Sequence, residues 1–277
     1  MALYGLAFLT RAVRLNLLLP EDERFPLFRA ASLSASATFL LQVIPFRGGE
    51  IAGWAAYRKA LGSGWARAGA VFALVKVIDS ASVLLLGLFG AAVMASRRGA
   101  PIMAMGPLLL LGTAALTLLS LPRLTGGFVL RFSSKMKKGG RLERISLEMG
   151  RTLVEAAASP PRYVLAVVWA FVFLGFYVGA MALVCHGLGV PVSLAGLSFA
   201  ALTSITAAAV LPSPAGTFGP NESGFAAGLA FDGVALGTGV LTGAVLHVLL
   251  TATAGLVGLP FLLSGAREEK VRKANER

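Results

Sequence analysis

Charged residues are scarce in this chain, and their scarcity decides its class. They make up 14% of the 277 residues, against 56% hydrophobic residues, whereas soluble domains carry about 25% charged residues. Three stretches contain no Asp, Glu, Lys or Arg: 30–46, 99–122 and 163–221. Long uncharged apolar stretches are typical of membrane helices. The sequence therefore predicts an all-α polytopic membrane protein.

Cysteine and histidine are nearly absent. The one cysteine, Cys185, excludes an internal disulfide, and we expect it to pack within an apolar span. The two histidines, His186 and His247, lie far apart in the sequence, and no cluster of His and Asp suggests a metal site. No Ser–His–Asp arrangement is evident either. We therefore expect no catalytic residues, no metal and no cofactor.

Acidic residues number 13 against 25 basic ones, which gives a net charge of +12. The basic residues cluster at 123–162 and after Gly265, with little aromatic interleaving, so we expect no nucleic-acid partner. In a membrane protein such clusters mark cytoplasmic segments. We expect a multi-pass protein of the cell (inner) membrane, with loop 123–162 and the C-terminus in the cytoplasm.

The stretch Leu211–Glu222, LPSPAGTFGPNE, interrupts a long apolar region with three prolines and two glycines. Proline removes a backbone donor and glycine permits dihedral angles that a helix excludes, so a helix that reaches Leu211 is expected to end there. A broken helix persists in a membrane only where it is buried in protein or lines a wet cavity. Because a charge near the bilayer centre costs about 2.5–3.5 kcal/mol, Glu222 makes this break a candidate site.

A second break of the same kind occurs at Pro45–Glu50, PFRGGE, after the apolar run Ala30–Ile44. Each break is followed by a short apolar segment, Ile51–Leu61 in one case and Ser223–Val234 in the other. At 1.5 Å per residue neither segment crosses a hydrocarbon core of about 30 Å alone. The pattern is typical of transporter repeats with discontinuous helices.

The two halves carry this series of segments in the same order. We expect a single transmembrane domain, 1–277, whose parts are a first half, an amphipathic cytoplasmic connection, a second half and a polar, disordered tail, at 1–122, 123–162, 163–264 and 265–277. With the connection and the tail in the cytoplasm, the two broken hairpins enter from opposite faces. The sequence thus predicts an inverted repeat with two re-entrant broken-helix hairpins that meet near the midplane.

Other segments have simpler interpretations. We expect a long helix at Ala66–Ala95, with Lys76 and Asp79 one turn apart inside it, and a span at Ile102–Leu121. Helical spacing of apolar residues in the connection predicts either an amphipathic helix along the cytoplasmic surface or a solvated link. Asp232 is expected to be solvated near the outer face.

The breaks suit a lipid headgroup. The amino end of each short helix carries free N–H groups and the positive end of the dipole, which favour phosphate. Basic side chains add charge-assisted donors, acidic ones balance them or accept a cationic headgroup or a proton, and small polar residues add neutral hydrogen bonds. The expected substrate-binding residues are Arg47, Glu50, Lys76, Asp79, Ser213, Thr217, Asn221, Glu222 and His247.

Each candidate also has a purely structural interpretation. The four charged residues of the first half, from Arg47 to Asp79, can pair with one another to hold their hairpin. Glu222 can cap the next helix at the membrane surface. His247 can be a hydrogen-bonded core histidine rather than a proton carrier.

Three motifs connect the chain to a known family. IPFRGGE at Ile44–Glu50, KVID at Lys76–Asp79 and LPSPAGTFGPNE at Leu211–Glu222 resemble the transmembrane region of lysylphosphatidylglycerol synthases, a flippase-like family related to the multiple peptide resistance factor. The similarity covers nearly the whole chain.

The chain departs from the family pattern at several positions. Family members usually have arginine where Lys76 stands, often arginine at His247, usually glycine at Ala215 and frequently arginine at Gly53. They also usually have a further span before the segment with Arg14, so we expect the chain to be truncated at its start.

The resemblance implies movement of a lipid across the bilayer: an aminoacylated phospholipid in some members, a polyisoprenoid-phosphate-linked sugar or a hopanoid in others. It does not imply synthesis, since only a short tail follows Ser264, where some relatives carry a soluble aminoacyl transferase domain. We therefore expect a lipid flippase whose partners are membrane lipids and which can form an oligomer. The alternatives are a membrane-embedded lipid-modifying enzyme and a non-transporting partner of a lipid-synthesis complex.

Overall fold

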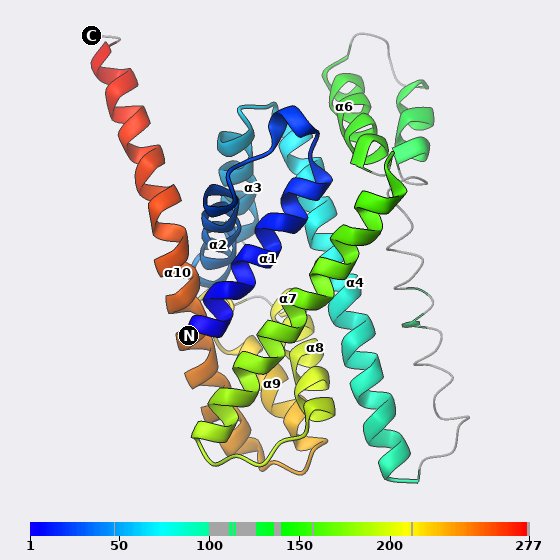
Figure 1. Ribbon diagram of the computed structural model, residues 1–277, viewed down its shortest axis with the longest axis vertical. Coiled ribbons are helices and arrows are strands. Elements are labelled where there is room, and N and C mark those ends of the chain that lie inside the picture. Colours follow the sequence, from blue (N-terminus) through cyan, green and yellow to red (C-terminus); the bar gives the residue numbers. More distant parts are fainter. Residues whose placement is uncertain are drawn as a thin grey trace.

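The structure, a computed structural model, describes residues 1–46, 48–99, 111–112, 114, 126–135, 140–156, 158–211 and 213–275. Arg47, most of the expected span Ile102–Leu121 and parts of the connection 123–162 lie outside this set. The secondary structure of the described residues is entirely helical (Figure 1). Its elements are α1 (Ala2–Leu18), a 3-10 turn (Glu21–Glu23), α2 (Leu27–Val43), α3 (Gly48–Leu61), α4 (Trp65–Arg97), α6 (Arg141–Ala156), α7 (Pro160–Gly187), α8 (Leu194–Val210), α9 (Pro220–Ala230) and α10 (Leu236–Asn275).

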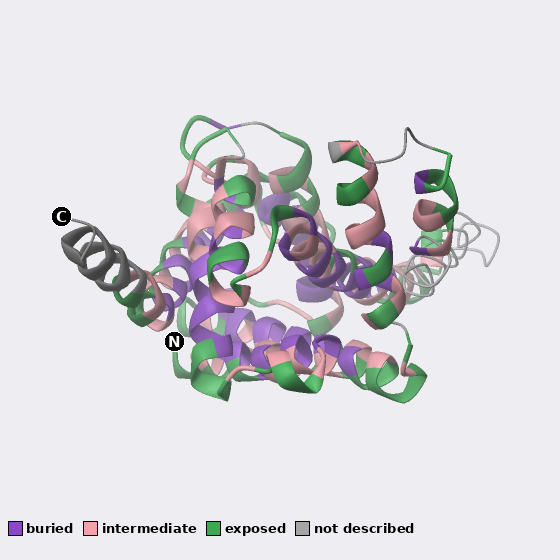
Figure 2. Ribbon diagram, turned by 90° about the horizontal axis from the view of Figure 1, so that it is seen from above, coloured by how far each residue is buried: buried purple, intermediate pink, exposed green. Residues whose placement is uncertain are grey.

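In the part of the chain that the structure describes, three helices are long and apolar enough to cross a membrane. They are α4, α7 and the part of α10 from Leu236 to Ser264, with mean hydropathies of 2.1, 2.3 and 2.0. Large apolar side chains on their outer faces are exposed, among them Phe89, Leu183 and Leu256, while the buried residues lie where the helices face one another (Figure 2). This distribution suits a lipid environment. The prediction of an all-helical membrane protein is confirmed.

Both predicted helix breaks are present. Helix α2 ends at Val43 and α3 begins at Gly48, while α8 ends at Val210 and α9 begins at Pro220. With 14 and 11 residues, α3 and α9 are about 21 Å and 16 Å long. Since the hydrocarbon core is about 30 Å thick, neither helix spans it alone.

The helices on either side of each break form a hairpin, and two long helices join the hairpins. Helix α2 packs against α3, and α8 packs against α9. Helix α4 contacts both α3 and α8, while α10 contacts both α9 and α2. In Figure 1 the α2–α3 hairpin occupies the upper half of the molecule and the α8–α9 hairpin the lower half, so the two breaks meet between them.

Small residues allow this close packing. A Cβ atom on Gly49 would lie 2.4 Å from the Leu40 carbonyl oxygen, and one on Gly228 would lie 2.4 Å from the Ala200 Cα atom. Across the α2–α10 contact, the Ser36 hydroxyl donates to the Gly258 carbonyl at 2.8 Å. Small residues and hydroxyl hydrogen bonds are the usual means by which membrane helices associate, because burial of apolar surface gives no advantage over lipid.

Two sequence expectations about the charged segments have different outcomes. The amphipathic helix is confirmed as α6, Arg141–Ala156, which packs against α4; its place on a cytoplasmic surface stays a prediction. The prediction of a disordered tail is wrong, because α10 continues to Asn275. The residues after Gly265 are rich in Glu, Lys, Arg and Ala, and all four are good helix formers that extend a helix already begun.

Asp232 was expected to be solvated, but its carboxylate instead holds the start of α8. Its carboxylate accepts hydrogen bonds from the Ser193 N–H at 2.5 Å and the Ser193 hydroxyl at 2.9 Å. Ser193 is the N-cap residue of α8, and its hydroxyl oxygen accepts a bond from the Gly196 N–H at 3.0 Å. Asp232, two positions after the end of α9, thus fixes the first turn of α8.

We expect Asp232→Ala to lower the free energy of unfolding by about 1–2 kcal/mol, because it removes both bonds that orient the cap residue. Thermal unfolding of the purified protein in detergent measures the change. Asp22→Ala, in the exposed 3-10 turn, is the matched control and is expected to unfold like the wild type. Equal melting temperatures for both variants would show that the cap is dispensable.

Candidate functional site

The two helix breaks are hydrogen-bonded directly to each other. The Phe46 N–H donates to the Ser213 carbonyl oxygen, and the Thr217 N–H donates to the Gln42 carbonyl oxygen, both at 3.1 Å. These four residues lie at or just after the ends of α2 and α8, where main-chain groups no longer have partners within a helix. The main-chain groups left unpaired by one break therefore bond to those of the other break. We refer to this pair of bonds as the junction.

Gly216 is required where the junction forms. Its φ is +69°, a conformation that L side chains rarely adopt, and a Cβ atom there would lie 2.0 Å from the Gln42 carbonyl oxygen. On the other side of the junction, Phe46 adopts a φ of +50°, which costs a non-glycine residue about 1–2 kcal/mol. The first break is therefore strained, and the second has a residue without a side chain at the point of closest approach.

A cavity of about 240 Å³ lies beside the junction. Its walls come from α1, α2, α3, α4, α7, α8, α9 and both breaks, so it is at the centre of the bundle and belongs to both halves of the chain. Six of the nine candidate residues line it: Glu50, Lys76, Asp79, Ser213, Thr217 and Asn221. The structure thus brings together residues that are far apart in the sequence.

An ion-pair cluster forms one side of the cavity. The Asp79 carboxylate accepts from Arg11 at 3.2 Å and is also bonded by Arg14. The Arg11 guanidinium donates to the Thr38 hydroxyl at 2.7 Å and lies 4.0 Å from the centre of the Phe173 ring. Asp79 therefore pairs with arginines of α1. The alternative in which it pairs with Arg47 involves a residue outside the described set.

Positive charge is in excess around the cavity. Among the described residues, the cluster and the lining include three basic side chains, Arg11, Arg14 and Lys76, and two acidic ones, Glu50 and Asp79. Arg14 is only 1% exposed. A charge inside an apolar bundle needs a counter-charge, because isolated ions are costly to hold away from water. The site therefore favours an anion.

Two polar atoms at the cavity are left without partners. The Arg11 Nε atom and the Gln42 Oε1 atom are buried and make no hydrogen bond in the described part of the chain. Buried polar groups without partners are costly, so such atoms favour a ligand that supplies an acceptor and a donor. Apolar side chains from Ile44, Tyr177 and Ile205 complete the walls. The cavity suits a polar group attached to an apolar body.

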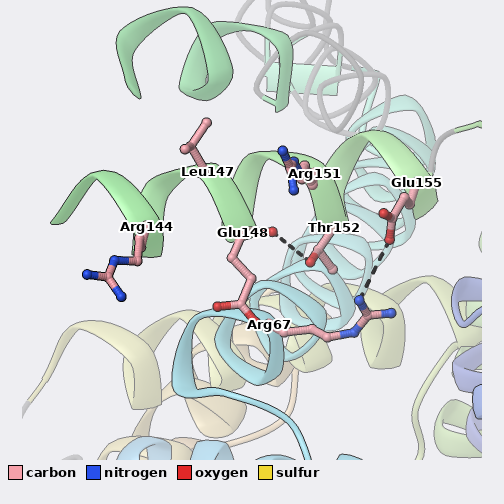
Figure 3. Close-up of a pocket in the computed structure, with 7 residues that line it drawn as sticks. All are labelled: Arg67, Arg144, Leu147, Glu148, Arg151, Thr152 and Glu155. Carbon is pink, nitrogen blue, oxygen red and sulfur yellow. Dashed lines mark hydrogen bonds and ion pairs between the residues drawn. The ribbon is translucent and has the colours of Figure 1, made fainter. Parts of the chain in front are cut away.

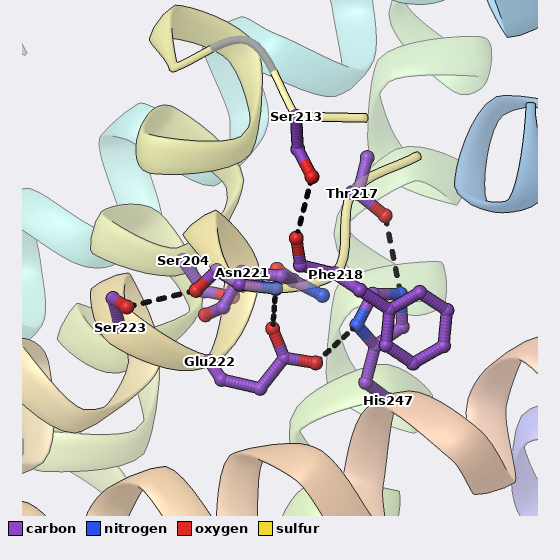
Figure 4. Close-up of polar contacts among 9 residues, drawn as sticks. Ser204, Ser213, Thr217, Phe218, Asn221, Glu222, Ser223 and His247 are labelled. Carbon is purple, nitrogen blue, oxygen red and sulfur yellow. Dashed lines mark hydrogen bonds and ion pairs between the residues drawn. The ribbon is translucent and has the colours of Figure 1, made fainter. Parts of the chain in front are cut away.

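Glu222 and His247 lie next to the cavity but not in its lining. They are 6% and 1% exposed, and Glu222 Oε1 is 2.6 Å from His247 Nδ1. Glu222 Oε2 also accepts from the Gly219 N–H at 2.6 Å, at the start of α9. The His247 Nε2 atom is 3.1 Å from the Thr217 hydroxyl (Figure 4). Glu222 and His247 thus hold Thr217, which does line the cavity, through its hydroxyl.

A second cavity, of about 310 Å³, lies between the start of α4 and α6 (Figure 3). Its lining includes Arg67, Arg151 and Glu155. Arg67 bonds to Glu23 at 2.8 Å and lies 3.9 Å from Glu155. These charges compensate one another, and the cavity lies away from both breaks, so it is not part of the site formed there.

Sequence reasoning missed the contribution of α1. Arg11 and Arg14 stand three positions apart in an otherwise apolar segment, which places both on one face of a helix. Intramembrane charges of this kind need a partner, and that requirement was the available signal. Gln42 gave no signal, because only the tertiary structure turns it toward the cavity.

The long apolar helices and the charged cavity within them define a polytopic membrane protein with a polar interior site. The chain belongs to the family described as the lysylphosphatidylglycerol synthase TM region, whose model matches residues 1–258. The family resemblance drawn from the sequence motifs is thereby confirmed. No curated protein and no solved structure matches the chain.

Proposed function

We propose that the protein moves a lipid with a phosphate-bearing headgroup across the bilayer. The observation that carries this proposal is the charged cavity at the point where two broken helices meet inside an apolar bundle. Lys76 and Arg11 attract the phosphate, and Glu50 balances the positive charge or accepts a cationic group attached to the phosphate. The acyl chains stay in the bilayer, so only the headgroup needs a polar path.

The proposal includes an inverted repeat, which the pairing of the helices supports. If α1–α4 correspond to α7–α10, the contact of α4 with α8 has its counterpart in the contact of α10 with α2. The α2–α3 and α8–α9 hairpins correspond likewise, as do the α3–α4 and α9–α10 pairs. In this proposal the hairpins are re-entrant and approach from opposite faces, as in transporters whose substrate site lies at the repeat interface.

Access to the cavity then alternates between the two faces. Because α4 and α10 each contact both hairpins, a tilt of these two helices together would open the cavity toward one face while closing it toward the other. We place the cytoplasm on the side of the connection 123–162 and the C-terminus, following their excess of basic residues.

The test is lipid translocation in reconstituted vesicles. We expect Lys76→Ala and Glu50→Gln to slow the movement of a fluorescent phosphatidylglycerol about tenfold or more, because a charge-assisted hydrogen bond contributes about 1.5–3 kcal/mol. Lys59→Ala and Glu21→Gln, which change the same residue types outside the lining of the cavity, are the matched controls. A probe with an uncharged sugar headgroup is expected to move slowly with every variant.

Two results would contradict the proposal. One is a translocation rate for Lys76→Ala equal to that of Lys59→Ala. The other is wild-type protein that leaves both probes in their original leaflet. In the second case, mass spectrometry of the recovered lipids separates the alternatives: a changed lipid mass indicates a lipid-modifying enzyme, and unchanged lipids favour a partner in a lipid-synthesis complex.

A further inference from the structure

A buried chain of hydrogen bonds leads from the cavity to a carboxylate. Thr217, which lines the cavity, contacts His247 Nε2 at 3.1 Å, and His247 Nδ1 contacts Glu222 at 2.6 Å (Figure 4). The Phe218 ring is stacked on the imidazole, with 3.9 Å between ring centres and 14° between planes. The imidazole is thus held at both nitrogens and on one face.

We propose that Thr217, His247 and Glu222 form a proton site that couples protonation to the binding of the headgroup in the cavity. This inference rests on the proposed lipid transport and names its coupling ion. It uses the same cavity, because the proton site reaches the headgroup through the Thr217 hydroxyl.

Protonation of His247 reverses one hydrogen bond. The Glu222 carboxylate accepts bonds from the Gly219 N–H and from His247 Nδ1, so Nδ1 carries a hydrogen in either state of the imidazole. In the neutral ring Nε2 accepts the Thr217 hydroxyl hydrogen. In the protonated ring Nε2 donates instead, and the hydroxyl hydrogen is released toward the cavity. Proton uptake therefore turns Thr217 into a donor for a phosphate oxygen.

Charge works in the same direction. Uptake of a proton adds one positive charge beside a cavity that already favours anions, so it strengthens phosphate binding, and phosphate binding strengthens proton uptake by the same factor. The Phe218 ring also offers its π face to an imidazolium. Release of the lipid on the other side of the membrane then favours release of the proton.

In the part of the chain that the structure describes, Glu222 is the ionisable residue of α9, and its carboxylate contacts His247 Nδ1. Helix α2 presents Ser32 and Ser36 to α10, and Met1, which precedes α1 and carries the N-terminal amine, contacts Thr253 of α10. Tyr4 and Arg11 of α1 and Tyr177 of α7 line the cavity, as do Glu50 of α3 and Lys76 and Asp79 of α4.

The first experiment observes the imidazole directly. The chain has two histidines, so His186→Gln, at an exposed position near the end of α7, leaves His247 as the source of the histidine signal in a ¹³C,¹⁵N-histidine NMR spectrum. In detergent we expect the protonated fraction of His247 at fixed pH to increase after addition of phosphatidylglycerol. A protonated fraction that is the same with and without phosphatidylglycerol overturns the proposal.

The second experiment measures transport under an imposed pH gradient. We expect the wild type and His186→Gln to move phosphatidylglycerol at least threefold faster along a proton gradient than without one. His247→Gln and Thr217→Val, which remove the titrating ring and the hydroxyl, are expected to lose this acceleration; Thr217→Ser is expected to keep it. If the wild type moves lipid at the same rate with and without the gradient, the proton site is overturned and the proposed lipid transport is not. If the wild type moves no lipid in either condition, the proposed function is overturned.

Discussion

Asp79→Asn is expected to lower the free energy of unfolding by about 3–5 kcal/mol, the largest effect of any single substitution considered for this protein. The asparagine keeps the shape of the side chain and removes its charge. Arg14, 1% exposed, and Arg11 then face each other without the carboxylate that both contact. Breaking a buried ion pair by removing one partner leaves an uncompensated buried charge, which is strongly destabilising.

The melting temperature in detergent and the yield of monodisperse protein measure this effect. Glu21→Gln is the matched control: it removes a carboxylate that pairs with Arg24 and Arg162 at the surface, where such pairs contribute about 0–1 kcal/mol. The double variant Arg14→Met with Asp79→Asn is expected to recover part of the loss, because it removes one of the two stranded charges. An Asp79→Asn variant that melts like Glu21→Gln would show that the cluster does not hold α1 in place.

Gly216→Ala is the second substitution with a large expected effect, in this case on transport. The added Cβ atom would lie 2.0 Å from the Gln42 carbonyl oxygen, and alanine at a φ of +69° is strained. Either the two breaks move apart or the loop changes conformation, and both changes remove the bond from the Thr217 N–H to Gln42. We expect phosphatidylglycerol translocation to fall at least tenfold, with a loss of about 1–3 kcal/mol in stability.

Gly175→Ala is the control for this variant. Gly175 lies within α7, and a Cβ atom there would contact nothing within 4 Å. Translocation measured on equal amounts of reconstituted protein separates lost transport from lost protein. Wild-type rates for both variants would mean that the bundle tolerates separation of the breaks and that the cavity does not depend on the junction.

The breaks could be predicted from the sequence because proline and glycine act locally. Pro45 and Pro214 remove donors from helices that the surrounding apolar residues favour, and no distant contact is needed to end a helix there. The same holds for the amphipathic helix α6, whose pattern is contained in its own residues. Of the six candidates that line the cavity, Glu50, Ser213, Thr217 and Asn221 lie at the breaks, while Lys76 and Asp79 were predicted from their charges inside a long apolar helix.

The partners of the charged residues could not be predicted in this way. Asp79 pairs with α1, more than 60 positions earlier in the chain, and an apolar helix gives no indication of which neighbour it meets. Glu222 and His247 were both candidates, yet their direct contact depends on how α9 packs against α10. The prediction of a disordered tail after Gly265 was wrong for the opposite reason. Its polar composition suggested disorder, but the same residues extend a helix that begins earlier in α10.

The junction consists of main-chain atoms alone, and this has a consequence for how the protein can change over evolutionary time. Gln42 and Ser213 contribute carbonyl oxygens, which every residue possesses, and Phe46 and Thr217 contribute N–H groups, which proline alone lacks. Substitutions at positions 42, 213 and 217 are therefore expected to change the wall of the cavity while the hydrogen bonds of the junction stay in place. Position 216 is the exception, since no larger residue fits there.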